Sequence, residues 1–268
     1  MFTCKLICTD IDGTLLHPDG TITERTKKAI AEARRKDIIV ALVSGRLSLS
    51  LKTIQKELLI TGPLGCFNGS LILDESGAEI EAHPLDLSIY EKVLSFLSGC
   101  AVEHSVFTND RWFMREKNAW YEVEVQTSHI EGNVYELERL PEILQPNERI
   151  FKVLVMDEKA NIVGALQEEL EKQFGQSLNI FRSSARYIEI LARGVDKGHA
   201  VRSLCKTYSI EREHVMAVGD YYNDIGMLKE AGYAVAMGNA PHLVKEHAHF
   251  VARSNTENGL ALVIESIL

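Results

Sequence analysis

Acidic side chains follow two apolar segments that lie far apart in the sequence. The apolar run 4–10 ends in Asp10, with Asp12 two residues further on, and the run 215–220 ends in Asp220. Carboxylate oxygens are the ligands that a hard cation such as Mg²⁺ prefers, and a carboxylate can also act as a nucleophile. These residue types predict phosphoryl transfer through an aspartate, with a metal ion that offsets the repulsion between carboxylate and phosphate.

Other polar residues stand at the ends of further strand-like runs and at the start of one helical stretch. They are Ser44, Gly45 and Arg46 after the run 38–43, then Asn68, Lys197, Asn223 and Asp224. Ligands of parallel α/β sheets bind at the carboxyl ends of the strands, so we expect these side chains to converge at one edge. The Ser44 hydroxyl and the nearby backbone N–H groups can hold phosphoryl oxygens, and Lys197 would neutralise negative charge.

Asp10 is the predicted nucleophile, which would attack phosphorus in line and form an aspartyl-phosphate. Asp12 is placed to protonate the leaving oxygen and later to activate water. Asp10 and Asp220 would hold the metal ion. Each of these residues alone has an ordinary structural explanation, such as a turn or a helix cap. Their joint occurrence at successive strand ends is what favours a functional site.

An alternation of strands and helices must position these side chains. Buried-strand runs at 4–10, 38–43 and 215–220 alternate with helical stretches, the first of which begins near Thr23, a residue suited to a helix N-cap. This alternation predicts an α/β fold with a Rossmann-like, open and mostly parallel sheet that has helices on both faces.

The middle of the chain does not follow that alternation. Ser44 and Lys197 are separated by 197 − 44 = 153 residues, far more than one βαβ step. We therefore predict a catalytic core of residues 1–83 and 187–268, interrupted by an α+β lid domain of residues 84–186. A lid of this kind excludes water and selects substrates.

Composition narrows the possible partners. The 268 residues carry 29 Lys and Arg against 38 Asp and Glu, a formal net charge of −9. This balance argues against nucleic acid and against an anionic membrane surface, and no apolar run approaches the roughly 20 residues of a membrane span. Five scattered cysteines without a CxxC pair are typical of a reducing compartment. We expect a cytoplasmic protein, and no protein partner is predicted.

Four segments resemble the motifs of the haloacid dehalogenase-like (HAD) superfamily. They are DIDGTL, VSGR, GVDKG and GDYYND. AMGNAP and ENGLA near the C-terminus resemble its Cof-type sugar-phosphatase branch. The resemblance covers essentially the whole chain and implies a HAD core, an inserted type IIB cap and Mg²⁺-dependent phosphatase activity.

The resemblance also implies residue roles at the matching positions. It implies the roles described above for Asp10, Asp12, Ser44, Lys197 and Asp220. It adds that the main-chain carbonyl of Asp12 contacts Mg²⁺. Asn223 and Asp224 would hold the water shell of the metal, the lysine or the phosphate. Asn68 would face the cap and the substrate.

The predicted function is hydrolysis of small phosphorylated metabolites through an aspartyl-phosphate, with sugar phosphates as the expected substrates. A phosphohexomutase of the same branch begins with the same intermediate and stays open as an alternative. A phosphorylation-controlled receiver would need neither a leaving-group acid nor a lid. A non-catalytic protein that binds phosphorylated ligands would not need the full catalytic set. A metal-dependent turnover assay separates this last alternative from an enzyme.

Overall fold

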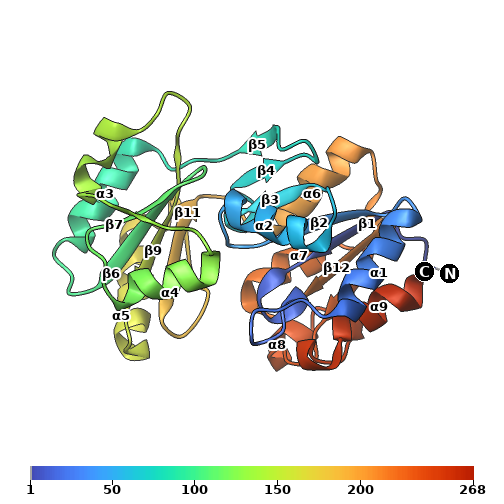
Figure 1. The fold of residues 1–268 in the computed structure, drawn as a ribbon. Helices are drawn as coiled ribbons and strands as arrows, with labels where there is room; N and C mark the ends of the chain where they lie inside the picture. Colours follow the sequence, from blue (N-terminus) through green and yellow to red (C-terminus); the bar gives the residue numbers. More distant parts are fainter. Residues whose placement is uncertain (1) are drawn as a thin grey trace. The chain divides into compact units, whose positions relative to one another are not determined.

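The structure is a computed structural model that describes residues 2–268, and Figure 1 shows its ribbon. The chain divides into two compact units. Unit 1 comprises the chain up to Gly45, Leu51–Ala82 and Asp196–Leu268, and unit 2 comprises Arg46–Ser50 and His83–Val195. Each unit has its own sheet and its own hydrophobic core.

An eight-stranded sheet forms the centre of unit 1 (Figure 1). In spatial order its strands are β14 (Phe250–Val251), β13 (Tyr233–Ala236), β12 (Val215–Gly219), β1 (Leu6–Thr9), β2 (Ile39–Val43), β3 (Leu64–Cys66), β4 (Leu71–Leu73) and β5 (Glu79–Ala82). The pairs from β14 to β3 are parallel, and β4 and β5 are added antiparallel. The central strand β1 is buried along its whole length, which explains its nearly continuous apolar sequence.

Helices cover the sheet of unit 1. They are α1 (Glu24–Arg35), α2 (Ser48–Leu58), α6 (Lys197–Tyr208), α7 (Ile225–Lys229), α8 (His242–Lys245) and α9 (Gly259–Ile267). Leu204 of α6 and Met227 of α7 share one core cluster with Leu6 and Ala217 of the sheet. The prediction of Thr23 as a cap is confirmed, because its hydroxyl oxygen accepts a hydrogen bond from the backbone N–H of Thr26. The predicted fold class, a mostly parallel open sheet with helices on both faces, is also confirmed.

Unit 2 is built on a six-stranded sheet with mainly antiparallel pairing. In spatial order its strands are β10 (Leu178–Arg182), β11 (Tyr187–Ala192), β9 (Ile150–Met156), β6 (Glu103–Thr108), β7 (Trp112–Met114) and β8 (Asn133–Val134). The helices α3 (Leu87–Leu97) and α5 (Ala160–Phe174) contribute Leu94 and Leu170 to the core of this unit. Helix α4 (Ala119–Ser128) packs Tyr121 against Trp112, with ring centroids 4.8 Å apart.

The limits of unit 2 differ from the predicted insertion of residues 84–186. Strand β11 pairs with both β9 and β10, with Ile190 opposite Val153, so residues 187–195 belong with the unit 2 sheet and not with the core. Unit 2 also includes Arg46–Ser50, which fall within the predicted core of residues 1–83. The pairing of β11 is long-range and is not visible in local residue patterns.

Two further observations concern the chain as a whole. Across residues 2–268, no helix is both long enough and apolar enough to cross a membrane. The five cysteines are free thiols.

Candidate active site

The predicted strand ends meet in unit 1. Asp10 follows β1, Ser44 follows β2 and Asp220 follows β12, and β1 lies between the other two strands with parallel pairing. Parallel strands place their carboxyl ends at the same edge, so three residues that are distant in sequence share one site. All three are buried, with Asp10 5% exposed and Asp220 9% exposed.

A buried lysine lies between two carboxylates of this site. The Nζ atom of Lys197 donates to Asp10 Oδ1 and to Asp224 Oδ1, at 2.5 Å in each case. Lys197 is 1% exposed and Asp224 is fully buried. Burial by itself lowers the pKa of the Lys197 ammonium, but the charges of Asp10 and Asp224 outweigh this effect and raise it. Lys197 is therefore a permanent cation in contact with the predicted nucleophile.

Asp224 is fixed by the loop that follows β12. Its Oδ2 atom accepts the backbone N–H groups of Asp220 and Tyr221, both at 2.8 Å. Because Oδ1 accepts from Lys197, both oxygens of Asp224 are engaged by donors. Asp224 thus orients the lysine and the loop that carries Asp220.

Asp220 is held by two neutral donors. The Thr14 hydroxyl donates to Oδ1 at 3.1 Å, and the Asn239 side-chain amide donates to Oδ2 at 3.1 Å. Burial, together with the charge of Asp224, raises the pKa of Asp220 to about 7. Burial also raises the pKa of Asp10, with further contributions from Asp224 and Asp220 that the Lys197 charge opposes.

This carboxylate cluster fits a hard divalent cation. Oxygens of Asp10, Asp220 and Asp224 all lie within 4.8 Å of one another. The three carboxylates face a single lysine, so an additional cation would relieve their mutual repulsion. Oxygen donors are those preferred by Mg²⁺. Asp224 accepts three donors, two of them on Oδ2, whereas Asp220 accepts one neutral donor on each oxygen, so Asp10 and Asp220 are the better-suited ligands.

A glycine in the loop of residues 10–16, which carries the predicted nucleophile Asp10, allows this cluster to be compact. Gly13 has φ +81°, and a Cβ atom at this position would lie 2.3 Å from Asp220 Oδ2. No side chain fits there without moving the carboxylate, so glycine serves both the turn and the close approach. Asp12, one residue earlier, is exposed, an accessible position for a group that is expected to exchange protons with a substrate.

The structure brings Asn68 and Asn223 together. The side-chain amide of Asn223 donates to Asn68 Oδ1 at 3.0 Å. Asn68 has φ +53°, a left-handed conformation that asparagine tolerates better than most residues. Its backbone N–H donates to the carbonyl oxygen of Ser44 at 2.9 Å, which joins the ends of β2 and β3.

Ser44 and Gly45 belong to unit 1, whereas Arg46 belongs to unit 2. Ser44 is buried at the end of β2, and the half-buried Gly45 is the last residue of unit 1 before the chain passes to unit 2. Arg46 belongs to unit 2, where its guanidinium donates to the carbonyl oxygen of Thr127 at 2.7 Å. Arg46 was predicted to bind phosphate beside Ser44, but its guanidinium contacts the Thr127 backbone of unit 2.

Two residues of this site were not predicted from the sequence, Thr14 and Asn239. Thr14 stands in DIDGTL and Asn239 in AMGNAP, two segments that were recognised without assigning a role to these side chains. Their polar side chains in loops after strands were the available signal. Thr14 and Asn239 lie 206 and 19 positions from Asp220 in the sequence. Local residue patterns therefore do not show that Asp220 is their hydrogen-bond partner.

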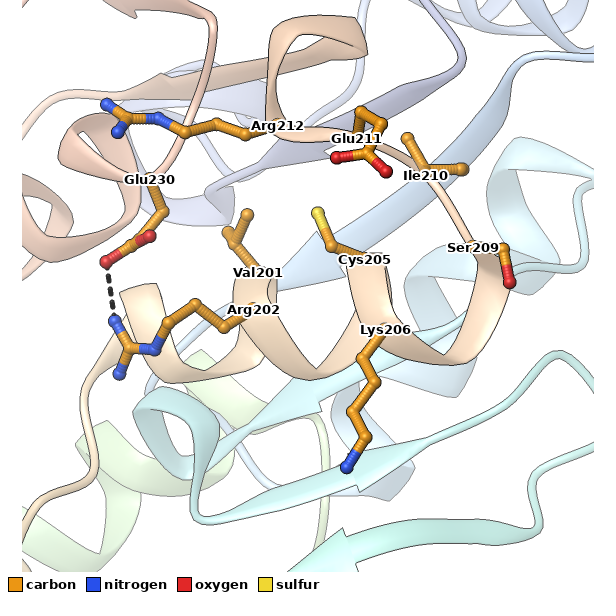
Figure 2. Close-up of a pocket in the computed structure, with 9 residues that line it drawn as sticks. All are labelled: Val201, Arg202, Cys205, Lys206, Ser209, Ile210, Glu211, Arg212 and Glu230. Atoms are coloured by element: carbon orange, nitrogen blue, oxygen red, sulfur yellow. Dashed lines mark hydrogen bonds and ion pairs between the residues drawn. The ribbon is translucent and has the colours of Figure 1, made fainter.

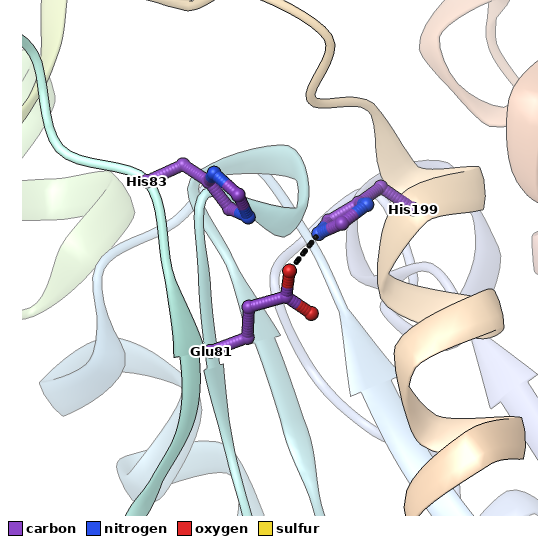
Figure 3. A group of neighbouring side chains, drawn as sticks. All are labelled: Glu81, His83 and His199. Atoms are coloured by element: carbon purple, nitrogen blue, oxygen red, sulfur yellow. Dashed lines mark ion pairs between the residues drawn. The ribbon is translucent and has the colours of Figure 1, made fainter.

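Other polar features of unit 1 lie outside this cluster. A groove of about 440 Å³ is lined by Cys205 and by charged residues that include Arg202 and Glu230, which pair at 2.7 Å (Figure 2). Burial raises the pKa of the Cys205 thiol, so it is a poor nucleophile. Figure 3 shows an ion pair between Glu81 and His199, with 3.3 Å between the carboxylate oxygen and Nε2. Neither feature combines a nucleophile with a general acid.

Known proteins resemble this chain in both sequence and fold. The family model described as haloacid dehalogenase-like hydrolase matches residues 7–264. The 5-amino-6-(5-phospho-D-ribitylamino)uracil phosphatase YcsE of Bacillus subtilis is 32% identical over 263 residues, which cover 97% of this chain and 94% of that protein. The crystal structure of a haloacid dehalogenase-like hydrolase from Bacteroides thetaiotaomicron has a TM-score of 0.90 at 26% identity, and the match covers 99% of this chain and 100% of that one.

The chain belongs to the haloacid dehalogenase-like hydrolase family, and its enzyme class is that of a phosphatase. The predicted membership of the Cof-type branch is confirmed as well. Enzymes of this superfamily generally use a divalent metal ion, which agrees with the acidic cluster described above.

Proposed function

We propose that this protein is a Mg²⁺-dependent phosphatase of small phosphorylated metabolites that acts through an aspartyl-phosphate on Asp10. The observation that carries the proposal is the buried array in which Lys197 contacts both Asp10 and Asp224, next to Asp220. An array of buried charges is a poor device for stability alone. It is well suited to holding a phosphoryl group and a cation against a nucleophile.

The proposed reaction has two displacements. A carboxylate oxygen of Asp10 attacks phosphorus, the bond from phosphorus to the ester oxygen breaks, and Asp12 gives its proton to the departing alcohol. Asp12 then takes a proton from water as the water oxygen attacks the same phosphorus. The bond between phosphorus and Asp10 breaks, which releases inorganic phosphate, restores the Asp10 carboxylate and leaves Asp12 protonated for the next cycle.

The remaining residues orient the reactants. When bound, Mg²⁺ would be held by Asp10, by Asp220 and by the main-chain carbonyl of Asp12, and would supply positive charge for the phosphoryl oxygens. Lys197 would balance the charge on Asp10 and on the phosphoryl group. Ser44 and the backbone of Gly45 would hold phosphoryl oxygens.

The second group of proposed contacts concerns specificity. Asn68, whose side chain is held by Asn223, would meet the substrate. Arg46 would contribute through its backbone N–H, because its guanidinium is engaged by Thr127. We further propose that unit 2 acts as a lid that excludes water and selects the substrate.

The proposed substrates are phosphate esters of sugars or of related polyols. The name of the Bacillus subtilis relative describes a phosphorylated ribityl compound, and a relative from Serratia proteamaculans, 28% identical over 88% of this chain, is named HMP-PP phosphatase. Both names describe small phosphorylated molecules. The free cysteine thiols support the proposal of a reducing, cytoplasmic environment.

The test is a phosphate-release screen over a panel of phosphorylated metabolites, with Mg²⁺ and with excess chelator. Asp10→Asn should lower the turnover by roughly 10³-fold or more, because it removes the nucleophile. Asp37→Asn is the matched control, since Asp37 is exposed and its φ of +58° suits asparagine.

The outcomes separate the alternatives. Metal-dependent release by the wild type and by Asp37→Asn, but not by Asp10→Asn, supports the proposal. Full activity of Asp10→Asn would contradict covalent catalysis. Isomerised sugar phosphate without phosphate release would identify a mutase.

A further inference from the structure

The side chain of Asn239, in the loop after β13, joins three segments of unit 1. Its Nδ2 atom donates to the carbonyl oxygen of Gly13 at 2.9 Å and to Asp220 Oδ2 at 3.1 Å. Its Oδ1 atom accepts the backbone N–H of Asn255 at 3.1 Å. One amide thus contacts the nucleophile loop, the loop after β12 and the segment before α9.

The orientation of this amide follows from its partners. On one side stand two acceptors, the Gly13 carbonyl and the Asp220 carboxylate, and on the other stands a donor, the Asn255 N–H. A flipped amide would place oxygen against two oxygens and an NH₂ group against an N–H. The hydrogen-bond network therefore admits a single assignment of the two atoms.

The hydrogen bonds from Thr14 and Asn239 restrict rotation of the Asp220 carboxylate. Thr14 donates to Oδ1 and Asn239 to Oδ2, so each oxygen has one fixed donor and keeps acceptor capacity for a further ligand. Both donors are neutral, so they orient the carboxylate without cancelling the charge that a cation needs. Groups that orient metal ligands in this way influence the affinity for the metal.

The same contacts secure the nucleophile loop. Asn239 binds the carbonyl of Gly13, and the Asn255 side chain donates to the carbonyl of Leu16 at 2.8 Å. Further along, the backbone N–H of Met237 donates to the carbonyl of Gly219, beside Asp220, at 3.0 Å. Residues 237–255 therefore contact both the loop that carries Asp10 and the loop that carries Asp220.

We infer that Asn239 is a positioning residue: it sets the geometry of the Asp220 carboxylate relative to the loop that carries Asp10, with Asn255 as its support. The inference rests on the proposed function in one respect, namely that Asp220 is a ligand of Mg²⁺. The Asn239 amide donates to the Gly13 carbonyl and to Asp220 Oδ2, so it acts on the site through Asp220.

The exposure of Asn239 makes the inference testable. Asn239 is exposed and contributes nothing to the core clusters, so the loss of its side chain should disturb the fold little. A change in metal affinity would then report the position of Asp220 and not partial unfolding.

The experiment compares Asn239→Leu, which removes the amide at similar volume, with wild type. Mg²⁺ binding is measured by isothermal titration calorimetry on the substrate-free protein. We expect the dissociation constant to rise roughly 10- to 100-fold, the usual effect of losing a group that orients a metal ligand. The unfolding temperature of the metal-free protein should change little. Asn255→Ala should weaken Mg²⁺ binding in the same direction but less, because the backbone N–H that binds Asn239 remains.

Asn161→Leu is the matched control, because Asn161 is exposed in unit 2 at the start of α5. The inference is overturned if Asn239→Leu binds Mg²⁺ within twofold of wild type, or if only its unfolding temperature falls. Wild type that binds Mg²⁺ but releases no phosphate would overturn the proposed function, while the calorimetric comparison would still decide the role of Asn239. Wild type that binds no Mg²⁺ would overturn both.

Discussion

Lys197 is the residue on which the charge balance of the site depends most directly. Its ammonium is 1% exposed and contacts Asp10 and Asp224, with Asp220 nearby. The desolvation of buried charges offsets most of their attraction, so such an array adds little net stability. Removing one member is costly, because its partners stay buried without compensation.

We predict that Lys197→Met lowers the free energy of unfolding of the metal-free protein by about 3–5 kcal/mol. Turnover should fall by about 10²–10³-fold with the loss of this charge. Chemical denaturation followed by circular dichroism measures the first effect. Adding Asp10→Asn to Lys197→Met should restore part of the stability, because one carboxylate becomes neutral. Lys229→Met, at an exposed position of α7, is the control, and equal destabilisation by the two single variants would contradict the argument.

At the scale of elements, α6 and α7 approach each other closely where they present Lys197 and Asp224. A Cβ atom on Gly198 would lie 2.6 Å from the carbonyl oxygen of Gly226, which is closer than real contacts allow. The glycine permits this approach of the two helices. Lys197 precedes Gly198 directly, so the position of the lysine depends on how these helices meet.

We predict that Gly198→Ala destabilises the protein by about 1–3 kcal/mol, the usual cost of overpacking. Turnover should fall with it, because α7 must shift away from the lysine. Gly164→Ala in α5 is the matched helical control: its Cβ would meet only an Arg182 nitrogen at 3.8 Å. That control should gain about 0.5–1 kcal/mol, because alanine is the better helix former. Thermal unfolding checks the prediction: the unfolding temperature should fall in Gly198→Ala and rise in Gly164→Ala. A rise in both variants would refute it.

At the scale of the molecule, the two units have separate sheets and cores, and only unit 2 contains tryptophan. Both tryptophans, Trp112 and Trp120, lie in unit 2, so tryptophan emission reports the unfolding of that unit. Unit 2 also contains His104, which is 6% exposed on β6. Burial, with a smaller contribution from the Arg115 charge, lowers the pKa of His104 from 6.5 to about 4.

This shift predicts acid sensitivity of unit 2. Between pH 6.5 and 4 the unfolded chain binds a proton at His104 that the folded chain does not, so stability falls as the pH is lowered through this range. The difference between the two pKa values of His104 corresponds to about 3 kcal/mol in the free energy of unfolding. This stability is present in full above pH 6.5 and is lost as the pH falls toward 4. Denaturation read by tryptophan emission should show this loss in wild type and a smaller loss in His104→Leu. Identical pH profiles of the two proteins would rule out this role of His104.

The sequence by itself predicted which residues stand at the strand ends that meet in unit 1. Asp10, Ser44 and Asp220 were found because each follows an apolar run, and parallel strands bring such ends together. The alternation of strands and helices was enough to predict the fold class of unit 1. Helix α4 was not predicted, because its apolar residues do not follow a helical period.

Only the tertiary structure decided how these residues are held. Lys197 lies between two carboxylates, and Thr14 and Asn239 hold the two oxygens of Asp220, through contacts between segments that are distant in sequence. Likewise, β11 joins the unit 2 sheet through its pairing with β9 and β10. Local residue patterns reflect the periodicity and burial of one element at a time. The partner of a hydrogen bond or of a strand is set by the packing of distant segments, which no single stretch of sequence contains.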